Sequence, residues 1–80
     1  MNICFLIGKI VSEIEFDFLC DDKKHDSIVG FDIETSDGFG GYTKTINRIY
    51  AYDEIADEIY SKYQKGSYIE VTGYIEDGKR

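Results

Sequence analysis

The sequence predicts one small all-β domain, an antiparallel barrel with a single helix, over residues 1–80. Four segments combine β-branched and aromatic residues with period-two alternation or a short apolar run. One segment of helical periodicity lies between the last two of them. No strand–helix–strand repetition of the kind that builds a parallel sheet is present. The predicted strands are 2–11 with 14–19, 27–35, 42–52 and 68–75.

The first strand is expected to be long and bent. Residues 2–11 form a short apolar, β-branched run, which favours a buried strand, and Gly8 marks a bulge or sharp bend. Residues 14–19 alternate apolar and acidic side chains, as a half-buried strand does, and we expect them to continue the first strand past the bend. In the second strand, 27–35, alternation predicts a buried face of three residues: Val29, Phe31 and Ile33.

The helix is expected directly after the third strand, 42–52, which itself follows a glycine-rich hairpin loop. Asp53 stands where an N-cap belongs, and Gly66 ends the helix. An apolar face arises from residues at i, i+4 and i+8: Ile55, Ile59 and Tyr63. This order matches the OB-fold, a five-stranded Greek-key barrel. Four strands are visible, so a fifth would follow Arg80 or come from a partner subunit.

Composition argues against several classes of function. Two cysteines, Cys4 and Cys20, without a signal-peptide pattern indicate reduced thiols and a cytoplasmic protein. His25 is the single histidine, and its acidic surroundings (Asp21, Asp22 and Asp26) favour a solvated turn over a metal site. No nucleophile, phosphate-loop or metal-ligand spacing is present. We therefore expect no enzyme, no cofactor and no membrane span.

Net charge is unevenly distributed along the chain. Residues 1–40 carry three Lys and nine Asp or Glu, whereas residues 41–80 carry six Lys or Arg and seven acids, for a total of −7. Nucleic acid repels acidic surfaces, so a nucleic-acid-binding surface should draw on the second half. The third predicted strand offers one. Alternation places four residues on one of its faces: Ile46, Arg48, Tyr50 and Tyr52.

An arginine beside two tyrosines is typical of non-specific single-strand binding. The rings stack on bases, each stack contributing about 1–3 kcal/mol whatever the base, and the guanidinium contacts phosphate. The same tyrosines would also suit a subunit interface, where aromatic residues are enriched. Tyr60 and Tyr63, at helical spacing, are expected to pack on the end of the barrel.

Residues 44–76 resemble the bacterial and phage single-stranded-DNA-binding (SSB) proteins, notably at Lys65-Gly66-Ser67. The opening Asn2-Ile3-Cys4-Phe5-Leu6-Ile7-Gly8-Lys9-Ile10 is also similar to that family's start. The resemblance covers most of the chain. It implies a homo-oligomer, a dimer or tetramer, that binds single-stranded DNA, or RNA, without sequence preference in replication, recombination, repair or mobile-element maintenance.

The same resemblance implies several of the site residues. Ile46 and Tyr52 align with base-stacking positions, Phe39 lies near another, and Lys9 aligns with a basic residue that contacts phosphate. The full candidate set is Lys9, Phe39, Lys44, Ile46, Arg48, Tyr50, Tyr52 and Tyr74. Asp32 and Glu34 depart from the pattern because they add negative charge beside the groove. The alternative is a degenerate OB module for oligomerisation or protein binding.

Overall fold

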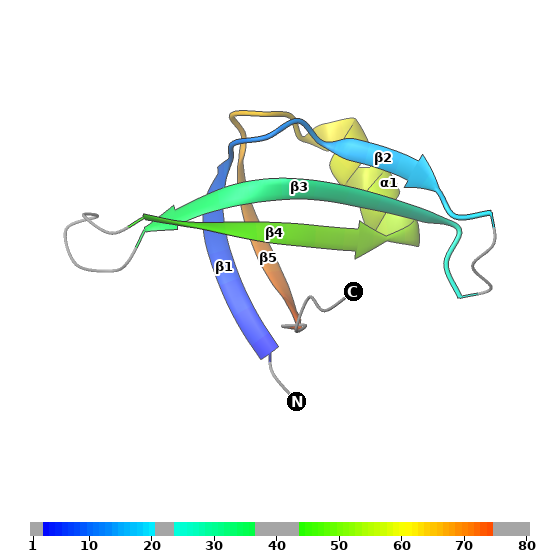
Figure 1. Cartoon of the computed structure of the whole chain (residues 1–80), viewed down its shortest axis with the longest axis horizontal. Helices are drawn as coiled ribbons and strands as arrows, with labels where there is room; N and C mark the ends of the chain where they lie inside the picture. The colour runs from blue at the N-terminus through cyan, green and yellow to red at the C-terminus, as the bar shows by residue number, and fades with distance from the viewer. Residues whose placement is uncertain (1–2, 21–23, 37–43, 75–80) are drawn as a thin grey trace.

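The structure, a computed structural model, describes residues 3–20, 24–36 and 44–74 (Figure 1). The elements in chain order are β1 (Ile3–Ile10), β2 (Glu15–Phe18), β3 (Ser27–Ser36), β4 (Lys44–Tyr52), α1 (Asp53–Lys62) and β5 (Tyr68–Tyr74). All pairings are antiparallel. β3 pairs with β1, β2 and β4, and β5 pairs with β1. Figure 1 shows β1 and β5 running steeply across the direction of β3 and β4.

The predicted fold class is confirmed: the molecule is a mostly antiparallel β-sheet with one helix, arranged as in an OB-fold. The sheet is not closed, because within the described ranges β4 pairs with β3 alone and β5 with β1 alone. The described residues form five strands where four were expected, since the first predicted strand is divided into β1 and β2. The last residue of the predicted fourth strand, Ile75, lies outside the described residues.

The division between β1 and β2 is a local insertion. Both strands pair with β3, and the two flanking registers are Ile10↔Ile33 and Glu15↔Gly30. Residues 11–14 therefore lie opposite only two residues of β3, 31–32. The Val11 N–H donates to the Asp32 carbonyl (2.9 Å), and the Ser12 hydroxyl accepts from the Asp32 N–H (2.8 Å). The interruption of the first predicted strand, expected at Gly8, therefore lies at residues 11–14. This insertion shifts the register of β2 along β3 by two residues.

Gly8 has a different role from the one predicted. A Cβ at this position would lie 2.6 Å from the carbonyl oxygen of Glu34, closer than atoms of this kind approach. β1 passes from its pairing with β5 to its pairing with β3 at this point. The glycine therefore permits a close approach of two backbones.

The core lies between the inner face of the sheet and α1. Its buried members are Ile10, Val29, Phe31, Ile33, Ala56, Ile59 and Ile69. The predicted face of β3 is thus buried as expected. Of the predicted helix stripe, Ile59 and Tyr63 pack on the core as expected, whereas Ala56 is buried in place of Ile55, which is 62% exposed. Tyr60 contacts Phe16 with ring centroids 5.1 Å apart but is largely exposed.

Two further expectations were wrong. β1 was expected to be buried, but only Gly8 and Ile10 are, and its outward residues are exposed because no element covers them in the described chain. Asp53 does not cap α1: Tyr52 is the N-cap residue and makes no side-chain capping bond. Asp53 adopts a positive φ of 58° instead, a conformation that Asp tolerates better than most residues. Among the described helices, none has the length and apolar character needed to span a membrane.

Candidate nucleic-acid interface

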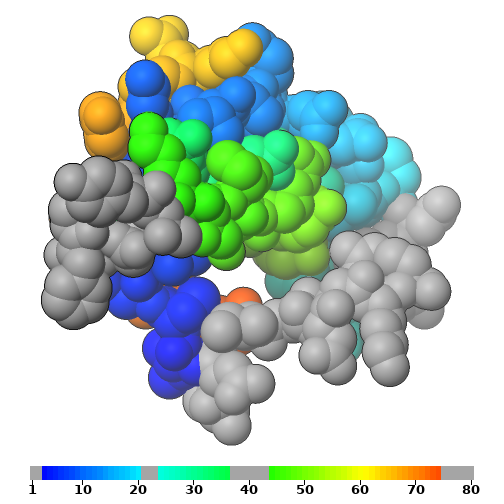
Figure 2. Space-filling model, turned by 60° about the vertical axis from the view of Figure 1, so that its left-hand side comes forward, coloured from blue at the N-terminus to red at the C-terminus, as the bar shows by residue number. Residues whose placement is uncertain are grey.

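Alternation along β2, β3 and β4 produces one outward-facing surface, called here the outer sheet face. The register aligns Tyr50 with Gly30 and Glu15 in one row, and Arg48 with Asp32 in the next. Figure 2 shows β4, in green, exposed in the middle of this view. The residues of the outer sheet face are Glu15, Asp17, Ile28, Gly30, Asp32, Glu34, Lys44, Ile46, Arg48, Tyr50 and Tyr52.

The apolar side chains of β4 on this face are open to solvent. Ile46 is 54% exposed, Tyr50 46% and Tyr52 37%. They alternate with the inward residues Asn47, Ile49 and Ala51, which are partly buried. Because side chains alternate along a strand, the two tyrosine rings and the guanidinium of Arg48 lie on the same side of β4.

Arg48 is the most extensively contacted cation of the face. Its Nη2 lies 2.8 Å from Glu15 Oε1, and its Nη1 lies 3.2 Å from Asp32 Oδ1. The guanidinium also lies over the ring of Tyr50, 5.5 Å from the centroid. The contact with Glu15, followed by those with Tyr50 and Asp32, raises the pKa of Arg48 above its ordinary value. Arg48 on β4 therefore forms ion pairs with both β2 and β3.

Gly30 provides the space in which Arg48 and Tyr50 lie. A Cβ at this position would be 3.0 Å from Arg48 Nη2 and 3.1 Å from Tyr50 Cε1. Because β3 has no side chain there, both groups can lie close to its backbone. Sequence reasoning missed this contact, although a glycine placed opposite a cross-strand aromatic is a recognisable signal once the register is known.

Tyr52 is already stacked on one side. The imidazole of His25 lies against it, with ring centroids 4.3 Å apart and an interplanar angle of 23°. His25 Nδ1 is 2.7 Å from Asp53 Oδ2, and Asp53 Oδ1 accepts a hydrogen bond from the Asp26 N–H (2.6 Å). The contact with His25 is the main cause that lowers the pKa of Asp53. The turn expected to be solvated thus supplies a neighbour of a candidate stacking ring.

Two predicted lysines flank the same acidic residue. Glu34 on β3 is in register with Lys9 on β1 and with Ile46 on β4. The Nζ of Lys44 lies 3.7 Å from Glu34 Oε1. Lys9, Lys44 and Ile46 are therefore brought to one end of the outer sheet face, around a carboxylate.

Tyr74 does not join this group. It pairs with Ile3 at the far end of β1, six residues beyond the Lys9↔Tyr68 pair, a distance of about 20 Å along the strand. Phe39 lies outside the described residues.

The outward side of β1 and β5 forms a second surface, called here the apolar face. Sequence reasoning missed it because an apolar run was taken as buried on both sides. Its large, exposed apolar members are Ile3, Phe5, Ile7, Tyr68 and Tyr74. An exposed patch of this kind typically marks an interaction site.

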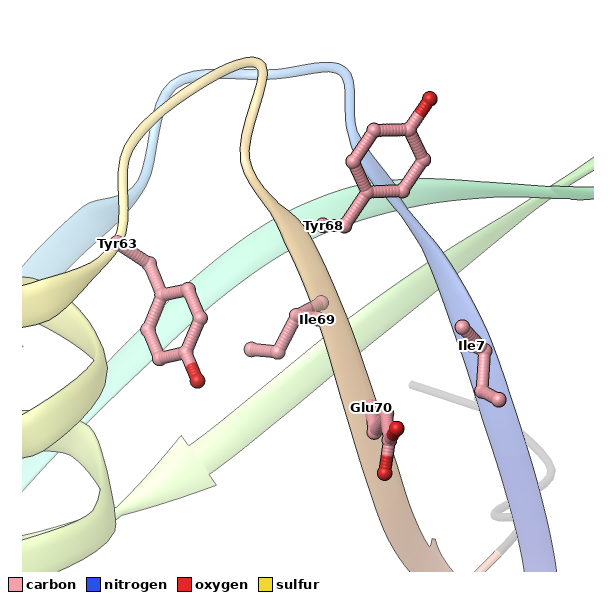
Figure 3. Close-up of a pocket in the computed structure, with 5 residues that line it drawn as sticks. All are labelled: Ile7, Tyr63, Tyr68, Ile69 and Glu70. Atoms are coloured by element: carbon pink, nitrogen blue, oxygen red, sulfur yellow. The ribbon is translucent and has the colours of Figure 1, made fainter.

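An open hollow beside β5 has a volume of about 460 Å³, and Figure 3 shows the residues that line it. Tyr63 and Ile69 lie on the side nearer the helix, and the other lining residues are Ile7, Tyr68 and Glu70. Among the described residues, the lining provides a single carboxylate, with no cation and no nucleophile beside a base. Within the described part of the chain, no group of three or more His, Cys, Asp or Glu could hold a metal ion.

Comparison with known proteins shows a similarity of fold alone. No family model matches the sequence, and no curated protein matches it. The fold is similar to the crystal structure of the SSB domain of a Synechococcus sp. protein, with a TM-score of 0.78 and 13% identity. The match covers 95% of this chain and 81% of that one. This chain has an SSB-like OB-fold. The identity is too low for the likeness to establish more than the fold.

Proposed function

We propose that the chain binds single-stranded DNA without sequence specificity through the outer sheet face. The observation that carries the proposal is the set of Ile46, Tyr50 and Tyr52, which project from the same side of β4 and remain exposed. Tyrosine rings stack on any base, because every base has a π face. The proposal is a binding function with no catalytic step.

Arg48 supports this function as a neighbour of the rings. A guanidinium carries five N–H donors, and two of its nitrogens are engaged by Glu15 and Asp32. Donors remain for a base edge that approaches from solvent. The likeness to an SSB domain adds support, because the OB-folds of that class hold single strands.

Fluorescence anisotropy with labelled oligo-dT at low salt tests the proposal, and oligo-rU in the same assay compares RNA. We expect binding that the double variant Tyr50→Ala, Tyr52→Ala weakens by about 1–3 kcal/mol for each stack lost. Tyr60→Ala is the matched control, since Tyr60 is an exposed tyrosine of α1, away from the outer sheet face. Absence of binding at tens of micromolar protein would contradict the function.

A second candidate function is oligomerisation or protein binding, and the apolar face favours it. Ile3, Phe5 and Ile7 project together from β1, and two tyrosines of β5 flank them. A monomer would leave this apolar area in water, at a cost of about 25 cal/mol for each Å² that a partner could cover. We propose a homo-oligomer, a dimer or tetramer. Light scattering that shows a monomer at high micromolar concentration would contradict it.

A further inference from the structure

The terminal nitrogens of Arg48 are held by carboxylates of the chain itself. Glu15 Oε1 occupies Nη2 at 2.8 Å, and Asp32 Oδ1 occupies Nη1 at 3.2 Å. Carboxylate and phosphate oxygens engage a guanidinium through the same N–H donors, with the same forked geometry. The places that a strand's phosphate would take at these two nitrogens are therefore filled before any ligand arrives.

This arrangement is assembled from three strands. Glu15 comes from β2, Asp32 from β3 and Arg48 from β4, so Arg48 and Glu15 reach each other across β3. They can do so because Gly30 leaves the backbone of β3 bare between them, with room for Nη2 only 3.0 Å from an added Cβ. The guanidinium is thereby held over the ring of Tyr50, 5.5 Å from its centroid, as a cation–π contact.

The rest of the outer sheet face has little uncompensated positive charge that could attract phosphate. Its acids are Glu15, Asp17, Asp32 and Glu34, and its cations are Lys44 and Arg48, with Lys9 of β1 at its edge beside Glu34. Lys44 also lies near a carboxylate, that of Glu34. A polyanion without bases would gain little attraction here, because affinity for phosphate depends on uncompensated positive charge. A base would still gain a stack.

We propose that Glu15 and Asp32 are specificity-determining residues. Their carboxylates pair with Arg48 and so reduce its attraction for phosphate. The outer sheet face therefore binds a single strand through its bases and not through its charge. The inference rests on the proposed function, since it concerns how the same face discriminates among single strands.

The test compares two ligands and a pair of charge-matched variants. Oligo-dT and an abasic strand of the same length are titrated by anisotropy against the unaltered chain, Glu15→Gln and Asp17→Asn, at several salt concentrations. Both variants remove one negative charge from the outward side of β2. Of these two carboxylates, that of Glu15 contacts Arg48, whereas that of Asp17 accepts a hydrogen bond from the Phe18 N–H. Circular dichroism confirms folding, and Asp32→Asn replaces Glu15→Gln if that variant does not fold.

The unaltered chain is expected to prefer oligo-dT over the abasic strand by roughly tenfold or more, the equivalent of one lost base stack. Glu15→Gln should tighten abasic binding by roughly three- to fivefold, the size of effect expected from an exposed ion pair. It should also steepen the salt slope by about 0.7, as one phosphate contact is gained. Asp17→Asn should leave the slope and the preference for bases unchanged.

The outcomes separate the inference from the function on which it rests. Equal gains in Glu15→Gln and Asp17→Asn would overturn the inference, because net charge alone would then account for them. Weaker binding of both ligands by Glu15→Gln would also overturn it, since Glu15 would then only position Arg48. In both cases binding of oligo-dT leaves the proposed function standing. If no variant binds oligo-dT, the function itself fails.

Discussion

His25 stacks on Tyr52, with ring centroids 4.3 Å apart and ring planes 23° apart. The contact links the turn before β3 to the end of β4. It also covers one side of a ring that the proposed function requires, and the imidazole Nδ1 is at the same time 2.7 Å from Asp53 Oδ2. Two predictions follow from this small cluster, one for stability and one for binding.

Asp53 should make the stability of the fold sensitive to acid. His25 lowers the pKa of Asp53 in the folded state, and the backbone N–H of Asp26 lowers it further. A carboxyl group of this kind stabilises the fold above its unfolded pKa, about 3.9, and the stabilisation is lost as the pH falls through the folded pKa. We expect Asp53→Asn to lower the Tm at pH 7 and the deficit to shrink below about pH 4.

Thermal melts followed by circular dichroism at pH 7 and pH 3 measure this deficit. Asparagine tolerates the positive φ of 58° at this position, so backbone strain does not confuse the comparison. Asp17→Asn removes an exposed charge elsewhere and serves as control. A deficit that is as large at pH 3 as at pH 7 would show that Asp53 acts through something other than its charge.

Tyr50 and Tyr52 should contribute unequally to DNA binding. His25 stacks on Tyr52 at 4.3 Å between ring centroids, whereas the Arg48 guanidinium lies farther from Tyr50, at 5.5 Å, and Tyr52 is 37% exposed against 46% for Tyr50. We therefore expect Tyr50→Ala to weaken oligo-dT binding more than Tyr52→Ala, within the range of about 1–3 kcal/mol for a stacked base. Anisotropy titrations of the two single variants measure the difference. A larger loss in Tyr52→Ala would mean that a base displaces His25.

Two glycines of the β1–β5 pair should respond oppositely to alanine. Gly8→Ala places a Cβ 2.6 Å from the Glu34 carbonyl, so β1 and β3 must separate, and we expect a loss of about 1–3 kcal/mol in unfolding free energy. Gly73→Ala meets nothing within 4 Å and should be neutral or stabilise by up to about 1 kcal/mol. Urea unfolding of both variants gives the comparison. Equal stabilities would refute the close approach at Gly8.

Phe5 should be needed for self-association and not for folding. Its side chain is 58% exposed on the apolar face, so Phe5→Asp leaves the core intact while placing a charge where a second copy would pack. We expect this variant to be a folded monomer at concentrations where the unaltered chain associates. Ile55→Asp, at a similarly exposed apolar residue of α1, should leave the mass by light scattering unchanged. Association that survives Phe5→Asp would exclude the apolar face as the interface.

Much of the fold was predictable because the relevant patterns are local. A strand alternates its side chains at every second residue whatever its partners are, so Phe31 and Ile33 could be assigned to the core and Tyr50 to the opposite side. The helix was likewise placed correctly between β4 and β5. The packing face of the helix includes Ala56 and not the predicted Ile55. Both residues are apolar, and only the position of the sheet determines which of them is buried.

The neighbours of the candidate site were not predictable in this way. Arg48 lies 33 residues from Glu15, and His25 lies 28 residues from Asp53. The first pairing depends on the register shift at residues 11–14, which moves β2 by two positions along β3. No local pattern encodes that shift, since it results from hydrogen bonds between distant backbones.

The order of residues alone therefore dictates the strands, the inward face of β3 and the side of β4 on which Arg48 and the tyrosines lie. Tertiary structure decides what those residues meet. It places carboxylates on Arg48 and an imidazole on Tyr52, and no described element covers the outward side of β1. The physical reason is that side-chain direction is set by backbone period, whereas partners are set by register and curvature across the sheet.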